Sequence, residues 1–128
     1  MNLSKHTSFI LLVAIFMVFS SCSSSLKAIR EKQALIDNGM DKKQVIEIMG
    51  APKDRQFKGD DEAWQYCGAS LDTYEFVIVW FYKGRVTGLN TYKTYNCPTI
   101  MNCEKCFREV NWLEAPDRIV EFRNRNLN

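Results

Sequence analysis

The segment of the chain with the strongest β character is Glu75–Tyr82, which has the sequence EFVIVWFY. Its residues are β-branched or aromatic almost throughout, as is typical of a strand. Successive side chains of a strand point to opposite faces, and here both faces are apolar. One face carries Phe76, Ile78, Trp80 and Tyr82, and the other carries Val77, Val79 and Phe81. We therefore expect this strand at the centre of a sheet that is covered on both sides.

The residues on either side of this strand predict an antiparallel meander. Residues 83–85 follow it directly and are expected to form a hairpin turn in which Gly84 takes a positive φ. Val86–Tyr95 then returns as the next strand, in which Gly88 indicates a bulge. Upstream, Ala63–Cys67 is rich in aromatic residues and predicts an earlier strand.

Between the helical and the strand-forming parts of the chain lies a polar stretch, residues 54–62, with the sequence DRQFKGDDE. Gly59 is expected to provide its turn. Asp60, Asp61 and Glu62 form an acidic run, for which we expect a solvated loop. The run lacks the ligand spacing of an EF-hand, so a calcium site is not predicted.

Two helices are expected before the sheet. Apolar residues near helical spacing predict the first over residues 26–37, and Gly39 then stops it. The second has a capping box, in which Asp41 is the N-cap and Gln44 lies three residues on. Gly50 ends this helix. A helix of two turns is marginal alone, so it is expected to pack against the sheet.

The N-terminus has the layout of a secretory signal, with a charged start followed by the apolar run Phe9–Phe19. This run is too short to span a bilayer comfortably. Small residues then lead to Cys22 in the sequence VFSSC, which is typical of a lipobox although leucine is commonest where Phe19 stands. We predict that residues 1–21 are a signal peptide, that Cys22 carries palmitate and other acyl chains, and that residues 22–25 are a lipidated tether.

Composition excludes several classes of function for the mature chain. The single histidine, His6, lies in the predicted leader, so the mature chain cannot build a Ser-His-Asp or Cys-His pair or a histidine-ligated zinc site. We therefore expect no enzyme, no catalytic residue, no metal site and no cofactor. The chain has 17 Lys and Arg against 15 Asp and Glu, a balance that gives no footprint for nucleic acid.

Four cysteines follow Cys22 in the chain. Because an exported protein meets an oxidising compartment, an even number of cysteines predicts two disulfides, with three possible connectivities. A four-cysteine zinc site is an alternative, as is a redox-active CxxC. The disulfide candidates are Cys67, Cys97, Cys103 and Cys106, of which the last two are CxxC-spaced.

The C-terminal third of the chain carries three of these cysteines in residues 96–106, an expected irregular loop. Residues 107–112 and 118–123 are short and β-like, and predict an extra hairpin. Residues 124–128 are a polar tail. The second face of the central strand is expected to be covered either by residues 107–123, including Trp112, Ile119 and Phe122, or by a partner.

Residues 26–95 resemble a known family. The sequence GMDKKQVIEIMGAP, a polar stretch, WQY, an apolar strand and a glycine turn are similar to the SmpA/OmlA family of outer-membrane lipoproteins, which includes BamE of the β-barrel assembly machinery. The matching residues are Gly39, Met40, Val45, Gly50, Pro52, Trp64, Tyr66 and Gly84. The resemblance implies an α-α-β-β-β domain, a module that also occurs in β-lactamase-inhibitor-like protein binders. Asp41 stands where the family has serine or threonine, and the cysteine-rich segment has no counterpart in BamE.

We therefore expect a single α+β domain over residues 26–123, with two N-terminal helices packed on an antiparallel meander of three to five strands. Its expected role is that of a lipid-anchored module on the periplasmic side of the outer membrane, which binds envelope proteins. A thiol-disulfide or metal-binding protein that uses Cys103 and Cys106, or an inhibitor-type binding module, is the alternative. The candidate protein-binding residues are Trp64, Tyr66, Phe76 and Trp80.

Overall fold

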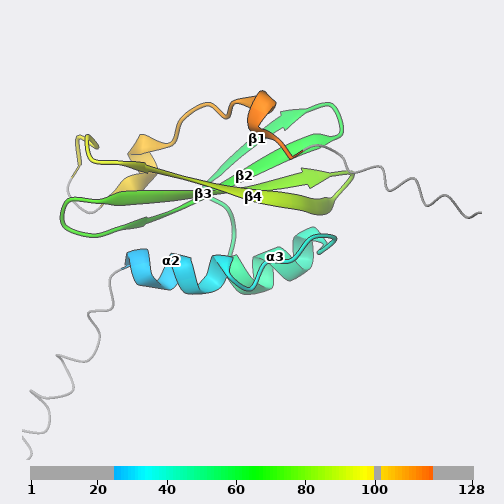
Figure 1. The fold of residues 1–128 in the computed structure, drawn as a ribbon, viewed down its shortest axis with the longest axis horizontal. Helices are drawn as coiled ribbons and strands as arrows, with labels where there is room; N and C mark the ends of the chain where they lie inside the picture. The colour runs from blue at the N-terminus through cyan, green and yellow to red at the C-terminus, as the bar shows by residue number, and fades with distance from the viewer. Residues whose placement is uncertain (1–24, 100–101, 117–128) are drawn as a thin grey trace, which may run out of the picture.

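The computed structural model describes residues 25–99 and 102–116, which form three layers (Figure 1). Two helices, α2 (Ser25–Gln33) and α3 (Lys42–Met49), follow one another along one face of an antiparallel sheet. The C-terminal segment crosses the opposite face. The predicted leader, Cys22 and the polar tail fall outside the described residues.

The sheet has the strand order β1-β2-β3-β4, and every neighbouring pair is antiparallel. The strands are β1 (Asp54–Lys58), β2 (Asp61–Ala69), β3 (Tyr74–Tyr82) and β4 (Arg85–Thr94). The expected class, an α+β domain with two helices and a meander of three to five strands, is confirmed.

The predicted capping box explains where α3 begins. Asp41 Oδ1 accepts from the backbone N–H of Gln44 at 2.9 Å, and Gln44 Oε1 accepts from the backbone N–H of Asp41 at 3.0 Å. The helix ends at Gly50, which has φ 85°. In contrast, α2 ends at Gln33 rather than at residue 37, because the backbone N–H groups of Leu35 and Ile36 bond to carbonyls three residues back, in a turn. This turn leaves Leu35 61% exposed.

Strand β3 is central, as its sequence predicts, and its first eight residues are all buried. On the helix side, its side chains pack with those of the two helices; on the other side, they pack under the C-terminal segment. The first set is Val77, Val79 and Phe81, and the second is Phe76, Ile78 and Trp80. Both apolar faces are thus used within the chain.

Gly59 provides the expected turn of the polar stretch, with φ 63°, but the solvated loop predicted for Asp60, Asp61 and Glu62 was wrong for the last two, which belong to β2. Residues 54–58 form β1, which pairs with β2 from Asp54↔Gln65 to Lys58↔Asp61. An edge strand exposes much of its surface, as shown by the 61% exposed Phe57, so a polar sequence can form one. Strand β2 is also longer than predicted and includes Glu62, which is only 4% exposed.

The turn between β3 and β4 has φ 47° at Lys83 and 77° at Gly84, as a tight hairpin requires. The predicted irregularity near Gly88 is also confirmed, because the register shifts where Trp80 and Phe81 pair with Gly88 and Val86. A Cβ on Gly88 would lie 2.5 Å from the Cγ atom of Pro116. The glycine therefore lets the C-terminal segment cross β4 closely.

Residues 102–116 form a cap over the second face of the sheet. The β-like pattern of residues 107–112 was misleading, because the described part of this segment holds only two short 3-10 helices, η2 (Cys103–Cys106) and η3 (Trp112–Glu114). The ring of Trp112 packs on Trp80 with centroids 5.7 Å apart. Residues 118–123 lie outside the described residues, so the second half of the expected hairpin is not placed. The part up to residue 116 already covers the face.

Candidate functional site

The four aromatic residues predicted to bind a partner are part of the core. Trp64 is 2% exposed, Tyr66 5%, Phe76 0% and Trp80 1%. The sequence identified them as large apolar groups on strands, and the helices and the cap then cover both faces of the sheet. That prediction is therefore corrected: these side chains leave almost no surface for a partner.

The W-x-Y motif places Trp64 and Tyr66 on the helix face of β2. The Trp64 ring packs on Phe81 at 4.6 Å between centroids, and its Nε1–H donates to the carboxylate of Glu62. The Tyr66 hydroxyl donates to the carbonyl oxygen of Gly50 at 3.0 Å, at the end of α3. Burial raises the pKa of Tyr66 well above its usual value. The phenol therefore remains a neutral hydrogen-bond donor that holds the helix against the sheet.

Glu62 is a buried carboxylate at the junction of α3, β1 and β2. It accepts from Lys42, from Trp64 and from Arg55, whose Nη2 lies 2.7 Å from Glu62 Oε1. Burial by itself raises the pKa of Glu62, but the hydrogen bonds from Lys42, Trp64 and Arg55 outweigh it, so the pKa is lowered overall. The carboxylate is thus kept ionised inside the fold.

Replacing Glu62 by glutamine is expected to reduce the free energy of unfolding at pH 7 by about 1 to 2 kcal/mol, since its cationic partners are half-exposed. Because the pKa of Glu62 is lower in the folded state than in the unfolded state, where it is about 4.3, the ionised carboxylate stabilises the fold above that pH. This stabilisation is lost as the pH falls through the pKa of Glu62 in the folded state. Urea unfolding from pH 7 to pH 3 measures it. The gap between Glu62→Gln and wild type should close in acid, and a gap independent of pH would contradict the assignment.

A second buried carboxylate, Glu75, joins α2 to the sheet. Arg30 donates to Glu75 Oε2 from Nε at 3.0 Å and from Nη2 at 2.7 Å. The hydrogen bond and charge of Glu75 raise the pKa of Arg30. Lys93 on β4 lies 3.7 Å from the same carboxylate.

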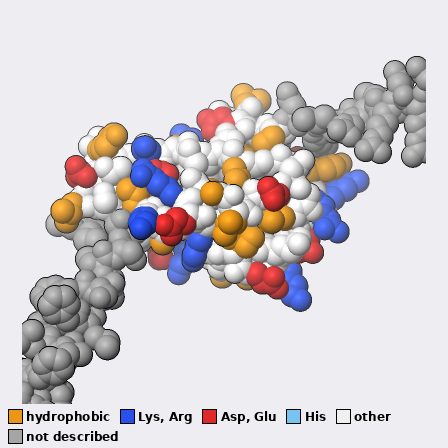
Figure 2. Space-filling view, turned by 60° about the horizontal axis from the view of Figure 1, so that its bottom comes forward, with side chains coloured by type: hydrophobic (Ala, Val, Ile, Leu, Met, Phe, Trp, Pro, Cys, Tyr) orange, Lys and Arg blue, Asp and Glu red, His pale blue; other side chains and the backbone are white. Residues whose placement is uncertain are grey.

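On the face turned forward in Figure 2, positive and negative side chains lie beside one another rather than in a patch of one sign.

The structure joins the four described cysteines into two disulfides. Cys67 on β2 pairs with Cys103 in η2, and Cys97 pairs with Cys106. The two cysteines of the CxxC are therefore not bonded to each other, which argues against a redox pair between them. Among the described residues, no group of three or more His, Cys, Asp or Glu side chains is placed to hold a metal ion. The disulfides instead fasten the cap to the sheet.

A buried network of side-chain amides, which the sequence analysis missed, also holds the cap. Gln65, with 0% exposure, donates to Asp54 Oδ2 at 2.6 Å and to the carbonyl oxygen of Arg108 at 2.7 Å. It accepts from the Tyr92 hydroxyl at 2.9 Å. Gln56 on β1 bonds both to the Arg108 carbonyl and to the backbone N–H of Val110. The one available signal was a glutamine between the two aromatics of the W-x-Y motif.

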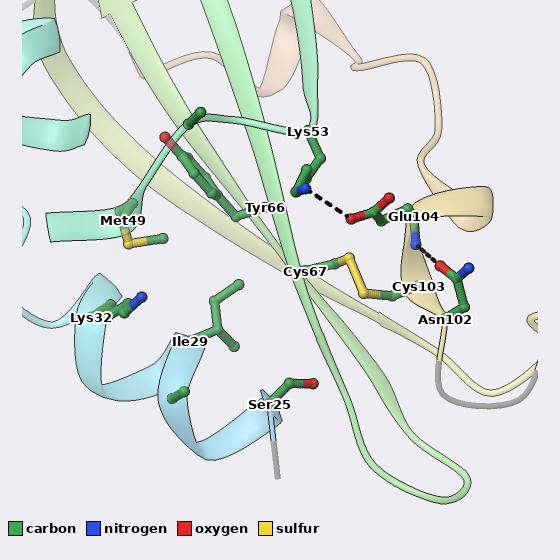
Figure 3. Close-up of a pocket in the computed structure, with 12 residues that line it drawn as sticks. Ser25, Ile29, Lys32, Met49, Lys53, Tyr66, Cys67, Asn102, Cys103 and Glu104 are labelled. Carbon is green, nitrogen blue, oxygen red and sulfur yellow. Dashed lines mark hydrogen bonds and ion pairs between the residues drawn. A yellow bond between two sulfur atoms is a disulfide. The ribbon is translucent and has the colours of Figure 1, made fainter. Parts of the chain in front are cut away.

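A pocket of about 360 Å³ opens where α2, the segment between α3 and β1, β2 and η2 meet (Figure 3). The Cys67–Cys103 disulfide forms part of its wall, as does the ion pair between Lys53 and Glu104, whose charged atoms are 3.3 Å apart. The pocket is mixed in character, since apolar side chains of α2 and α3, two lysines and Tyr66 all line it. That hydroxyl is already bonded to Gly50, so it is a structural group rather than a reactive one.

The fold and these sites define a small α+β domain whose second sheet face is closed by a disulfide-bonded cap. Comparison with known proteins found no match to this chain among protein families, curated proteins or solved structures. Within the part of the chain that the structure describes, no helix is long and apolar enough to cross a membrane.

Proposed function

We propose that this protein is a lipid-anchored envelope lipoprotein, similar to the SmpA/OmlA family, whose domain binds envelope proteins from the periplasmic side of the outer membrane. The observation that carries the proposal is the pairing of all four cysteines after Cys22 into disulfides. Disulfides form and persist in exported proteins, the same destination that the N-terminal leader predicts. Several acyl chains on Cys22 would hold the protein at the membrane more firmly than one chain.

The order of elements also supports the likeness to this family. Two helices precede an antiparallel meander, and the matching motif residues serve the fold: Gly50 ends α3, while Trp64 and Tyr66 pack beneath it. Strand β1 and the disulfide-bonded cap are additions to the α-α-β-β-β arrangement. The motif therefore supports a common scaffold, and any binding surface must lie outside its buried residues.

Lipid attachment is tested by labelling cells with radioactive palmitate while they express the full chain. Wild type should carry the label and sediment with outer membranes. Cys22→Ser should lose both properties, because serine lacks the thiol that is acylated, while the neighbouring control Ser23→Ala should keep them. Label retained by Cys22→Ser would refute the anchor.

Binding is tested by cross-linking the tagged full chain in the envelope and recovering it in detergent. An unrelated lipoprotein with the same anchor serves as the control. Specific recovery of barrel-assembly components would support the proposed role. Specific recovery of a hydrolase instead would favour an inhibitor-type module.

A further inference from the structure

The outer edge of β4 has backbone groups that the described part of the chain leaves unpaired. Gly39 donates to the Val86 carbonyl at 2.8 Å, and the Val86 N–H donates to the Met40 carbonyl at 2.9 Å. After Val86, no other described strand lies beside this edge. Residues 89–94 therefore form an open strand edge, the feature to which an extended peptide can add.

The register identifies which residues of this edge point their N–H and C=O groups outward. Val86 does so opposite Phe81, and in an antiparallel pair every second residue repeats this orientation. Beyond the bulge, the equivalent pairs are Val79↔Leu89, Val77↔Thr91 and Glu75↔Lys93. The outward-facing residues of β4 are therefore Leu89, Thr91 and Lys93.

A second pocket, of about 420 Å³, opens beside the end of this edge. It lies between β4 and the cap segment that the Cys97–Cys106 disulfide holds. Two cations of the cap line it, Lys105 and Arg108, together with Lys93 of β4, and its lining contains no carboxylate. The pocket is therefore suited to a negatively charged group.

The positive charge of this pocket is only partly neutralised. The ammonium of Lys93 lies 3.7 Å from Glu75 on the helix side of the sheet, so it does not add to the charge of the pocket. Lys105 is exposed and makes no ion pair within the part of the chain that is described.

Arg108 is held in place from two sides. Its guanidinium stacks 4.2 Å above the Tyr92 ring and lies 3.3 Å from Glu114. The pocket thus combines one fixed cation, Arg108, with one more adaptable cation, Lys105, and this arrangement attracts carboxylates.

We propose that an extended, acidic segment of a partner protein adds to β4 as a fifth strand and places its carboxylates in this basic pocket. The backbone groups of Leu89, Thr91 and Lys93 would provide affinity, and the two cations Lys105 and Arg108 would select for charge. The proposal rests on the proposed protein-binding role and names the chemistry of the partner.

The full chain, expressed with its leader and extracted in detergent, is titrated against a fluorescent eight-residue peptide that alternates glutamate with valine. We expect measurable binding that weakens with salt, and Lys105→Glu should weaken it on the order of tenfold. Lys43→Glu, an equal change of charge on an exposed residue of α3, should leave it unchanged. Equal loss in both variants would show general attraction between charges and overturn the proposal.

Strand addition is tested without altering the protein by methylating alternate backbone nitrogens of the peptide. Because methylation removes the donors that pair with an edge, we expect binding to fall at least tenfold. Thr91→Pro, which removes an outward N–H, should weaken the unmethylated peptide similarly if its unfolding midpoint is close to wild type. If methylated and unmethylated peptides bind equally, the pocket binds anions without strand addition, and the proposal fails even where the palmitate and cross-linking experiments succeed.

Discussion

Replacing Trp64 by alanine should reduce the free energy of unfolding by about 3 to 5 kcal/mol, the range for truncating a buried aromatic. The ring fills the space between the sheet and α3, packs on Phe81, and carries the cations of Arg55 and Lys42 over its faces at 5.3 and 5.9 Å. The change also removes the indole donor to Glu62. Because small domains are stable by only about 5 to 15 kcal/mol, a substantial unfolded population is expected.

Urea unfolding followed by circular dichroism measures this effect. Leu113→Ala is the matched control, because Leu113 is an apolar residue of the cap that is 93% exposed, and it should change stability by less than about 0.5 kcal/mol. A Trp64→Ala protein that unfolds at the wild-type urea concentration would show that Trp64 is not a core residue. Such a result would restore its original interpretation as a contact residue.

Removing the Cys67–Cys103 disulfide by a double alanine substitution should reduce the free energy of unfolding by about 4 kcal/mol. The reason is that the unfolded chain regains the conformational entropy that the closed loop had removed. The two cysteines are 36 residues apart and tie η2 to β2. Cys97 and Cys106 are only 9 residues apart, so removing their bond should cost about 2.5 kcal/mol. Thermal and urea unfolding of the two double variants makes the comparison.

The two variants should also differ in their effect on structure. Loss of Cys67–Cys103 frees the cap at its attachment to β2, so hydrogen exchange should increase for Gln65 and Tyr92, which lie beneath it. Loss of Cys97–Cys106 should affect mainly the basic pocket beside β4. Equal destabilisation by the two substitutions, with no added exchange at Gln65, would contradict the view that the first disulfide closes the sheet.

The predictions that were confirmed depend on interactions close together in the sequence. The capping box of α3 spans four residues, the hairpin turn depends on Lys83 and Gly84, and the burial of β3 follows from its eight consecutive strand-forming residues. Each is decided by local backbone preference or by hydrophobic pattern, and both can be recognised in a single sequence.

The predictions that failed depend on neighbours distant in the sequence. Residues 54–58 are too polar to indicate a strand, and they form one because β2 provides a partner for their backbone groups. The sequence predicted Glu62 to lie in a solvated acidic loop, but the residue is buried because Lys42 of α3 and Arg55 of β1 pair with its carboxylate. Such contacts leave no periodic pattern in the sequence.

The sequence by itself determined the central strand, its hairpin, the capped helix and the presence of four cysteines after Cys22 that can form disulfides. Local conformational preference and composition suffice for these features. Only the tertiary structure decided that the strand aromatics are core, which cysteines pair, and that residues 102–116 form a cap instead of a hairpin. The physical reason is that burial and disulfide pairing depend on which distant segments cover each face of β3. The basic pocket beside β4 likewise exists only once the cap is in place, because Lys105 and Arg108 belong to the cap.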